Sequence, residues 1–209
     1  LILASGDMLS GDREEGDAIA VALLSRLSDL APVCFVNGNH EMCVERHQPE
    51  RYQKFMDDLK NGGVQVLHNE TAWFWIDGEK VAVTGYELPW EYYRRFSRRH
   101  PSVVGMERSI GKRKQDAYQI LLTHNPVFFE EYAAWGADFT FAGHLHGGFI
   151  RLPYFGGVIS PQFQLFPKYD HGLYQMDTSS MVVGAGMGNH SGLFRINNPT
   201  EIVTVRIKR

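Results

Sequence analysis

Two histidines one residue apart follow a short apolar run at residues 139–142, and this arrangement restricts both the fold and the chemistry. Phe and Thr in the run favour a strand, and glycines lie on both sides of the histidines. Residues i and i+2 of an extended segment point the same way, so His144 and His146 can direct both imidazoles at one point past the strand end. Neutral imidazole is the commonest metal-ligating side chain. The stretch therefore predicts a metal site at the end of a strand.

Three further polar clusters lie upstream, each directly after an apolar run. They contain Asp7, Asn39 with His40, and His124. Taken singly, each cluster also suits an ordinary turn or cap, because Asp and Asn tolerate unusual backbone angles and bond to nearby backbone. Four such clusters in one chain favour a shared site, since α/β sheets form their sites in the loops at the carboxyl ends of strands.

The types of ligand narrow the choice of metal. The clusters offer one carboxylate, one amide oxygen and four imidazoles, with no thiolate. This mixture of nitrogen and oxygen donors suits Mn²⁺, Fe or Zn²⁺ rather than Cu(I) or an iron–sulfur cluster. A carboxylate can bridge two ions, and two ions about 3.5–4 Å apart form a clamp that serves phosphoryl chemistry. The two cysteines, Cys34 and Cys43, match neither a zinc motif nor a disulfide framework.

Hydrophobic periodicity predicts strands and helices that alternate in the first half of the chain. Asp77-Gly78 between two apolar runs is a strong hairpin signal, and residues 87–115 show no clear period. The expected helices are residues 17–30, 51–60 and 127–135, and the expected strands are residues 1–4, 33–36, 64–67, 73–76, 80–83, 118–122 and 139–142, followed by short β-like runs at 149–152, 173–176, 181–183 and 201–207. This order predicts two packed sheets with helices outside, in a single domain spanning residues 1–209.

Composition sets the broad class of protein. The chain has 209 residues, of which 44% are hydrophobic and 22% charged, as in a soluble globular domain. A net charge of −3 gives no reason to expect a nucleic-acid partner. No apolar stretch is long enough to cross a bilayer. The sequence begins inside an apolar run without methionine, so we expect the natural protein to continue upstream.

In their order along the chain, these clusters resemble the calcineurin-like metallophosphoesterase superfamily. The motifs that carry the resemblance are Gly6-Asp7, Gly38-Asn39-His40-Glu41, His124 and Gly143-His144-Leu145-His146-Gly147. Residues 147–174 are similar to a bacterial subgroup whose members are often exported or held at a membrane, which leaves the localisation open between the cytoplasmic face and the exterior. The resemblance implies an α/β fold, a four-layer α/β/β/α sandwich of two mixed sheets flanked by helices. It also implies metal-dependent hydrolysis of a phosphodiester or pyrophosphate, on a substrate linked to a lipid or a nucleotide.

The resemblance also implies a role for each residue of the clusters. His40 is the non-ligand histidine that contacts the phosphate and stabilises charge or protonates the leaving oxygen. The mechanism that the resemblance implies is in-line attack of a metal-bound hydroxide on phosphorus. The implied ligands of two divalent or trivalent ions are Asp7 as the bridge, Asn39, His124 and His144 at one ion, and His146 at the other.

The chain departs from the family pattern in two places. The family opens with an Asp-x-His motif on its first strand, which this sequence lacks, so an N-terminal strand is expected to be missing. Ser10 stands where many members place an aspartate that orients the catalytic histidine, and Asp12 lies nearby. Two alternatives therefore stay open: a nuclease or phosphomonoesterase of the same fold, and a non-catalytic metal-binding domain.

Residues 90–114 interleave arginines and lysines with aromatic side chains. A solvated loop is the ordinary interpretation of such a charge run. The functional alternative is a lid or surface patch that meets an anionic or lipid-bearing substrate, with Arg94 and Arg95 as substrate contacts. His171 is a further candidate for the lining of the substrate cleft.

Overall fold

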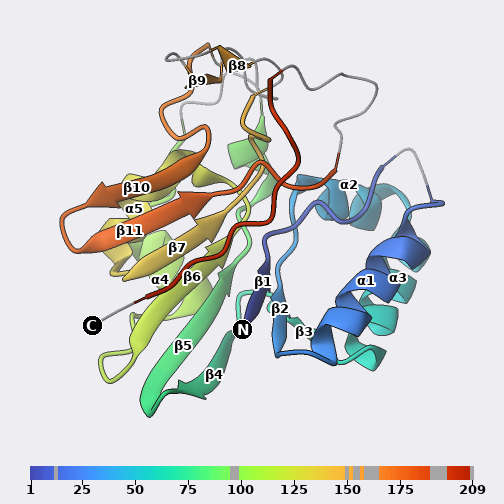
Figure 1. Cartoon of the computed structure of the whole chain (residues 1–209), viewed down its shortest axis with the longest axis horizontal. Helices are drawn as coiled ribbons and strands as arrows, with labels where there is room; N and C mark the ends of the chain where they lie inside the picture. The colour runs from blue at the N-terminus through green and yellow to red at the C-terminus, as the bar shows by residue number, and fades with distance from the viewer. Residues whose placement is uncertain are drawn as a thin grey trace.

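Two β-sheets lie face to face with helices on both outer sides, which gives the four layers expected from the sequence (Figure 1). The computed structural model describes residues 1–11, 14–94, 99–148, 151–152, 156–157, 165–188 and 197–207. Within these ranges, none of the helices has the length and apolar character that a bilayer span requires.

The smaller sheet has the strand order β1-β2-β3, and both pairs are parallel. Its strands are β1 (Ile2–Ala4), β2 (Val33–Phe35) and β3 (Gln65–Val66). Helices α1 (Asp17–Ser28) and α3 (Pro49–Asn61) cover its outer face, and α2 (Asn39–His47) lies above its carboxyl edge (Figure 1). Phe55, Met56 and Leu59 of α3 are buried in one cluster with Phe35 of β2.

The larger sheet is mixed and has the order β10-β11-β7-β6-β5-β4. Its central strands β5, β6, β7 and β11 run parallel, and β4 and β10 are antiparallel edges. The strands are β4 (Thr71–Ile76), β5 (Glu79–Tyr86), β6 (Tyr118–Thr123), β7 (Phe139–Ala142), β10 (Gly172–Met176) and β11 (Ser179–Val183). A separate pair joins β8 (Arg151–Leu152) to β9 (Gly156–Gly157).

Apolar side chains fill the space between the two sheets. Val36 and Leu67 reach it from the smaller sheet, and Val83, Ile120 and Leu122 reach it from the larger one. Full burial of each such side chain is worth about 1.5–3 kcal/mol. This shared core holds the carboxyl ends of β1, β2, β6 and β7 at the same edge of the molecule (Figure 1).

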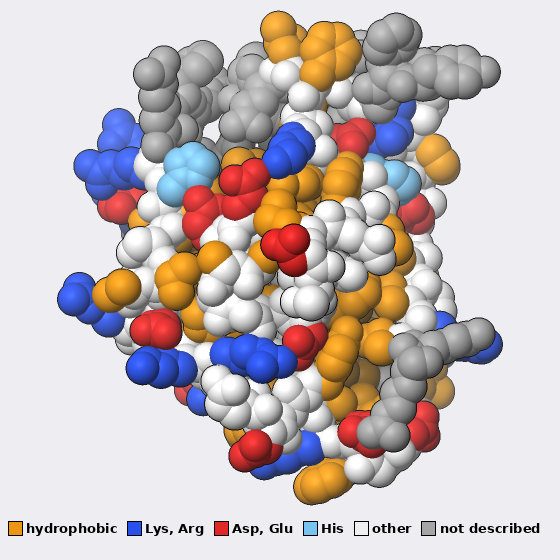
Figure 2. Space-filling view, turned by 90° about the vertical axis from the view of Figure 1, so that its left-hand side faces the viewer, with side chains coloured by type: hydrophobic (Ala, Val, Ile, Leu, Met, Phe, Trp, Pro, Cys, Tyr) orange, Lys and Arg blue, Asp and Glu red, His pale blue; other side chains and the backbone are white. Residues whose placement is uncertain are grey.

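The outer face of the larger sheet is covered by two short helices. They are α4 (Val103–Ile110) and α5 (Phe129–Trp135), with the 3₁₀ turns η1 (Trp90–Tyr93) and η2 (Pro126–Phe128) beside them. Met106, Tyr132 and Trp135 are buried with Leu121 of β6. Basic and acidic side chains are interspersed on the face that Figure 2 shows, in keeping with the small net charge.

The structure differs from the sequence prediction in three segments. Residues 87–115, which show no clear period, contain η1 and α4. The Asn39-His40 segment, expected to close a strand with no helix before residue 51, begins helix α2. Residues 201–207, expected to be β-like, form no strand. The Glu201 N–H donates to the Gly186 carbonyl just beyond β11, and β11 already pairs with β10 on one side and β7 on the other, so it cannot accept a further strand. Of the run at 149–152, only β8 lies within the described residues.

Candidate metal centre

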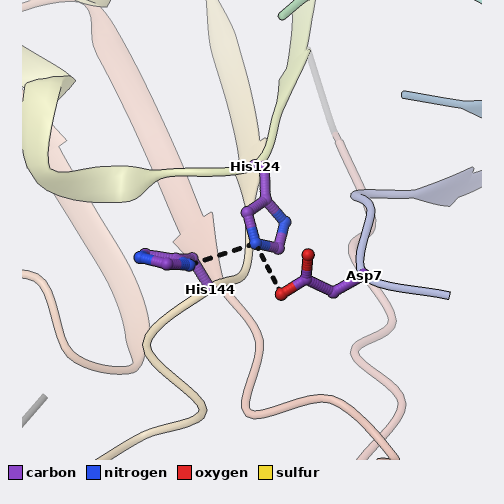
Figure 3. Close-up of side chains that lie close together, drawn as sticks. All are labelled: Asp7, His124 and His144. Carbon is purple, nitrogen blue, oxygen red and sulfur yellow. Dashed lines mark hydrogen bonds and ion pairs between the residues drawn. The ribbon is translucent and has the colours of Figure 1, made fainter. Parts of the chain in front are cut away.

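The polar clusters predicted from the sequence meet where the two sheets join. Asp7 follows β1, Asn39 follows β2, His124 follows β6 and His144 follows β7, all at carboxyl ends of parallel strands. Such edges are where α/β folds form ligand sites. Figure 3 shows Asp7 facing His124 and His144 across the junction.

Three side chains form a compact group of possible ligands. Asp7 Oδ2 lies 3.0 Å from His124 Nε2, and His144 Nδ1 lies 3.1 Å from the same nitrogen (Figure 3). The ligand atoms of Asp7, His124 and His144 all lie within 4.8 Å of one another. One carboxylate and two imidazoles at this spacing are a suitable donor set for a divalent metal ion.

Two buried atoms beside this group have no partner among the described residues. Asn39 Oδ1 and His144 Nε2 are both inaccessible to solvent and make no hydrogen bond there. A buried polar atom without a partner costs about 1–3 kcal/mol, so such atoms call for an explanation. An amide oxygen is a metal-ligand atom, and a cation bound by the group would satisfy Asn39 Oδ1. His144 Nε2 lies on the far side of its ring from Nδ1, the nitrogen that faces His124 (Figure 3). The residues present therefore fit a metal site.

Glycines let the loops after β1 and β2 approach each other closely. A Cβ on Gly6, which has a φ of 92°, would lie 2.4 Å from the Gly38 nitrogen. A Cβ on Gly38 would lie 2.2 Å from Asp7 Oδ1. Asp7 itself has a φ of 58°, an uncommon conformation for a residue with a side chain. Strain of this kind collects at functional sites.

Glu41 holds these two loops in place. It is fully buried, and its carboxylate accepts hydrogen bonds from the backbone N–H groups of Asp7 (2.8 Å), Leu9 (2.7 Å) and Gly38 (2.8 Å). Glu41 was not predicted to have a role. Its position three residues after Gly38, the N-cap of α2, is the signal that could have found it, because a Glu at N3 reaches back to the N-cap nitrogen.

A backbone carbonyl orients the His124 ring. His124 Nδ1 is hydrogen-bonded to the carbonyl oxygen of Ser5, which places its proton on Nδ1 and leaves Nε2 to face Asp7. Second partners of this kind fix the tautomer and direction of metal-ligating histidines. The contact also ties the β6 loop to the β1 loop, so it joins the two sheets at the site.

The charges of these side chains change one another's pKa. Burial acts to raise the pKa of Asp7, but His124, His40 and His144 outweigh burial and hold the Asp7 pKa far below its ordinary value. Burial acts to lower the pKa of His124, and Asp7 raises it by more. Burial and the adjacent His124 hold the pKa of His144 well below its ordinary value. Asp7 is therefore ionised and His144 neutral, as metal ligands must be.

His40 lies at the edge of the group. Its backbone N–H donates to Asp7 Oδ1 at 2.9 Å, and its Nε2 lies 4.0 Å from Asp7 Oδ2. The His40 side chain is 25% exposed, whereas that of His124 is 2% exposed. His40 is thus the more accessible imidazole of the pair.

Tyr93 of η1 covers the histidines from the side. Its ring centroid lies 5.3 Å from that of His144 and 6.1 Å from that of His124. Burial raises the pKa of Tyr93 well above its ordinary value. The sequence showed only an aromatic and basic segment here. The position of Tyr93 depends on how η1 folds over the sheet edge, and no local pattern encodes that.

His146 lies beside the group but not within it. Its nitrogens are not among the ligand atoms that gather within 4.8 Å, although its charge influences the pKa of His144. Its backbone has a φ of 50°, and its carbonyl accepts a hydrogen bond from Asn198, a residue that sequence analysis did not single out.

The remaining predicted residues lie away from the group or outside the described residues. Arg94 is exposed at the end of η1, and Arg95 and Asp12 fall outside the described residues. His171 Nε2 is paired with Glu201 Oε1 at 2.8 Å. The Ser10 carbonyl accepts from Arg51 at 2.9 Å, which ties the loop after Asp7 to α3.

The fold and the site together define the class of protein: an α/β/β/α sandwich that carries possible metal ligands, one carboxylate and two imidazoles, at the carboxyl edge of its strands. The sequence model of the family described as calcineurin-like phosphoesterase matches residues 1–148. The chain belongs to this family, whose members depend on divalent metal ions.

Curated bacterial proteins are distant relatives of the chain. "Uncharacterized protein YpbG" of Bacillus subtilis is 27% identical over 157 residues, which cover 71% of this chain and 53% of that protein. "Phosphodiesterase YaeI" of Escherichia coli is 24% identical over 207 residues, which cover 99% of this chain and 70% of that protein. The chain thus spans about half the length of YpbG and 70% of the length of YaeI.

The fold also matches a solved structure. Sulfate thiohydrolase SoxB of Thermus thermophilus, solved in complex with glycerol, aligns with a TM-score of 0.52 and 15% identity. The alignment covers 90% of this chain and 34% of that chain. At this identity the match supports the sandwich architecture alone.

Proposed function

We propose that the protein hydrolyses phosphodiester or pyrophosphate bonds with the help of two metal ions held at the sheet junction. The observation that carries this proposal is the group formed by Asp7, His124 and His144, together with the buried Asn39 Oδ1, which has no partner among the described residues. Family membership supports the reaction class, and the oxygen and nitrogen donors favour Mn²⁺, Fe or Zn²⁺.

Each candidate ligand has a distinct place in this proposal. Asp7 would be a ligand of both ions. Its two oxygens face different neighbours: Oδ1 accepts from the His40 N–H, and Oδ2 faces the ring of His124. Asn39, His124 and His144 complete one position, and His146 serves the other. When bound, the ions supply positive charge for the phosphoryl oxygens and lower the pKa of water.

His40 is the proposed partner of the phosphate. It is the more accessible imidazole beside Asp7, and its backbone is fixed by the hydrogen bond to Asp7 Oδ1. A histidine in this place can donate a hydrogen bond to a phosphoryl oxygen or a proton to the leaving oxygen. Asp7 orients it electrostatically, with 4.0 Å between Nε2 and Oδ2.

The proposed preference for a diester over a monoester rests on sequence similarity to a relative. The chain is similar over 207 residues to a protein named a phosphodiesterase. A substrate linked to a lipid or a nucleotide is part of the same proposal, with exposed Arg94 at the end of η1 as the contact for its anionic part. Vesicles bearing a phosphodiester lipid test this contact: Arg94→Gln should raise KM on the vesicles and leave KM on a small soluble diester unchanged.

The first experiment measures hydrolysis and metal content together. The protein is stripped with a chelator, reconstituted with Mn²⁺, Fe²⁺ or Zn²⁺, and assayed on bis-p-nitrophenyl phosphate and p-nitrophenyl phosphate. We expect His144→Ala to lose at least about 100-fold in kcat/KM, because even second-sphere partners of a metal are worth 10–100-fold. His47→Ala is the matched control, since His47 is exposed on α2 and bonds to the carbonyl of Cys43.

The outcomes separate the alternatives. Faster turnover of the diester supports the proposal, and faster turnover of the monoester makes the protein a phosphomonoesterase. Degradation of DNA or RNA, with little action on small diesters, makes it a nuclease. Stoichiometric metal without turnover of any phosphate ester makes it a non-catalytic metal-binding domain.

A further inference from the structure

The loop that carries His144 and His146 has an unusual backbone. Four of its residues have positive φ: His144 (63°), His146 (50°), Gly147 (69°) and Gly148 (82°). Glycine adopts this conformation freely, but the two histidines do so at a cost. A strained residue keeps such a conformation only when its surroundings enforce it. The contacts that enforce it here determine where the histidines point.

The loop's own contacts fix only part of this conformation. The Leu145 N–H donates to the Gly143 carbonyl at 2.7 Å, and the Gly148 N–H donates to the Leu145 carbonyl at 2.7 Å. The Leu145 side chain is fully buried and anchors the centre of the turn. These bonds do not use the carbonyls of residues 146–148, which follow the anchor.

Side chains from further along the chain bind all three of these carbonyls. Asn198 Nδ2 donates to the carbonyl of His146 and to that of Gly148, the latter at 2.8 Å. Arg151 Nη1 donates to the carbonyl of Gly147 at 3.0 Å. An amide –NH₂ has two hydrogens, so both donors of Asn198 serve this loop. Asn198 is 4% exposed, so water cannot readily replace it.

The two donors are themselves held in place. Arg151 Nη1 is paired with Asp170 Oδ2 at 2.9 Å, and Asp170 also accepts from the Gly157 N–H at 2.7 Å and from the Tyr174 hydroxyl at 2.8 Å. The segment that follows Asn198 is fixed at Glu201, whose Oε1 accepts from the Ala185 N–H at 2.8 Å and whose N–H donates to the Gly186 carbonyl at 3.2 Å. These supports lie in residues 151–201, downstream of the segment that matches the family model.

We propose that Asn198 and Arg151 are positioning residues that clamp the 146–148 carbonyls and so hold the His146 imidazole at the second metal position. The proposal rests on the two-ion function proposed above. It gives the part of the chain beyond residue 148 a defined task, which is to fix the geometry of one ligand. Breaking the clamp weakens one ion and spares the other, because the other ligands have their own supports. Glu41 holds the Asp7 backbone, the Ser5 carbonyl holds the His124 ring, and the buried Leu145 anchors the loop beside His144, before the clamp.

Asn198→Asp tests the clamp with a side chain of the same shape. The carboxylate has no hydrogen to donate and repels both carbonyl oxygens. Mn²⁺ binding to the chelator-stripped full chain is measured by calorimetry, and the spin-coupled Mn²⁺ pair by electron paramagnetic resonance. We expect one of the two binding steps to weaken by about tenfold or more, the other to stay within about twofold, and the coupled signal to disappear at Mn²⁺ levels that saturate the wild type.

The neighbouring residue provides the control. Asn197→Asp makes the same change of charge one position away, at an exposed residue, and should bind both ions like the wild type. His146→Ala should weaken the same step as Asn198→Asp. Arg151→Gln breaks the clamp at the Gly147 carbonyl. It provides an independent test of the clamp if Asn198→Asp unfolds in the chelator.

Two results would overturn the inference. One is unchanged binding of both ions to Asn198→Asp and Arg151→Gln, and the other is an equal loss of both ions, which would mean general unfolding. Failure of the two-ion function itself appears in the wild type, as a single binding step that His146→Ala leaves unchanged. That outcome would also rule out the positioning role of Asn198. It is recognised from the wild type and His146→Ala alone, without Asn198→Asp or Arg151→Gln.

Discussion

The most direct test of how the site is built is Glu41→Gln. The Glu41 carboxylate accepts three backbone N–H groups, two on Oε2 (from Asp7 and Gly38) and one on Oε1 (from Leu9). A glutamine amide has one oxygen, so it can still accept the first two bonds, but its –NH₂ then faces the Leu9 N–H. That donor is left buried without an acceptor.

The expected loss of stability in Glu41→Gln follows from these three hydrogen bonds. A buried donor without a partner costs about 1–3 kcal/mol, and each of the two remaining bonds loses about 1 kcal/mol when the acceptor becomes neutral. Loss of the buried charge offsets part of this, since burial raises the pKa of Glu41 and so disfavours its ionised form. We expect a net loss of about 2–4 kcal/mol in the free energy of unfolding.

Urea unfolding in chelator, followed by circular dichroism, measures this loss without any contribution from metal. Glu45→Gln is the matched control because it lies one turn further along α2 and is exposed. We expect it to change stability by no more than about 0.5 kcal/mol. A loss below about 1 kcal/mol for Glu41→Gln would show that the three bonds do not hold the loops.

Three further perturbations test other parts of the structure. Gly38→Ala puts a Cβ 2.2 Å from Asp7 Oδ1 and so displaces this carboxylate. The affinity for Mn²⁺, measured by calorimetry, should therefore fall by about tenfold or more. Unchanged affinity would show that Asp7 can move freely. Glu87 raises the pKa of His68, so the stability lost in His68→Gln should be greatest below about pH 6.5 and vanish as pH rises through the folded-state pKa. A pH-independent difference in urea unfolding would contradict that pair. Arg51→Lys loses the bidentate ion pair with Asp17 of α1, so the free energy of unfolding should fall by about 1–2 kcal/mol. No change in that free energy would show that the ion pair is dispensable.

Local sequence patterns predicted the structure correctly where one short segment determines it. The strand at 139–142 was predicted with its bounds because an apolar run of β-formers ends at Gly143. The hairpin around Asp77-Gly78 was predicted because its turn needs residues that tolerate positive φ, and both have it. The meeting of Asp7, His124 and His144 followed from their places after parallel strands.

Contacts between distant segments were not predictable from such patterns. Helix α2 begins at Asn39 because Gly38 and Glu41 provide its N-terminal contact, and the sequence there also suits a turn. Residues 201–207 have a β-like composition, yet β11 has no free side to receive them. The places of Tyr93 over His144 and of Asn198 under the 146–148 loop depend on packing between segments about 50 residues apart.

The division of the site between two sheets has a consequence for folding. Asp7 belongs to the smaller sheet and His124 and His144 to the larger one, so the chain must close a contact across more than half its length before the group exists. Contacts of such long range slow folding. A cation that binds only the docked sheets stabilises them by about 2.7 kcal/mol at a concentration 100 times its Kd. Refolding with and without Mn²⁺ would therefore report when the two sheets come together.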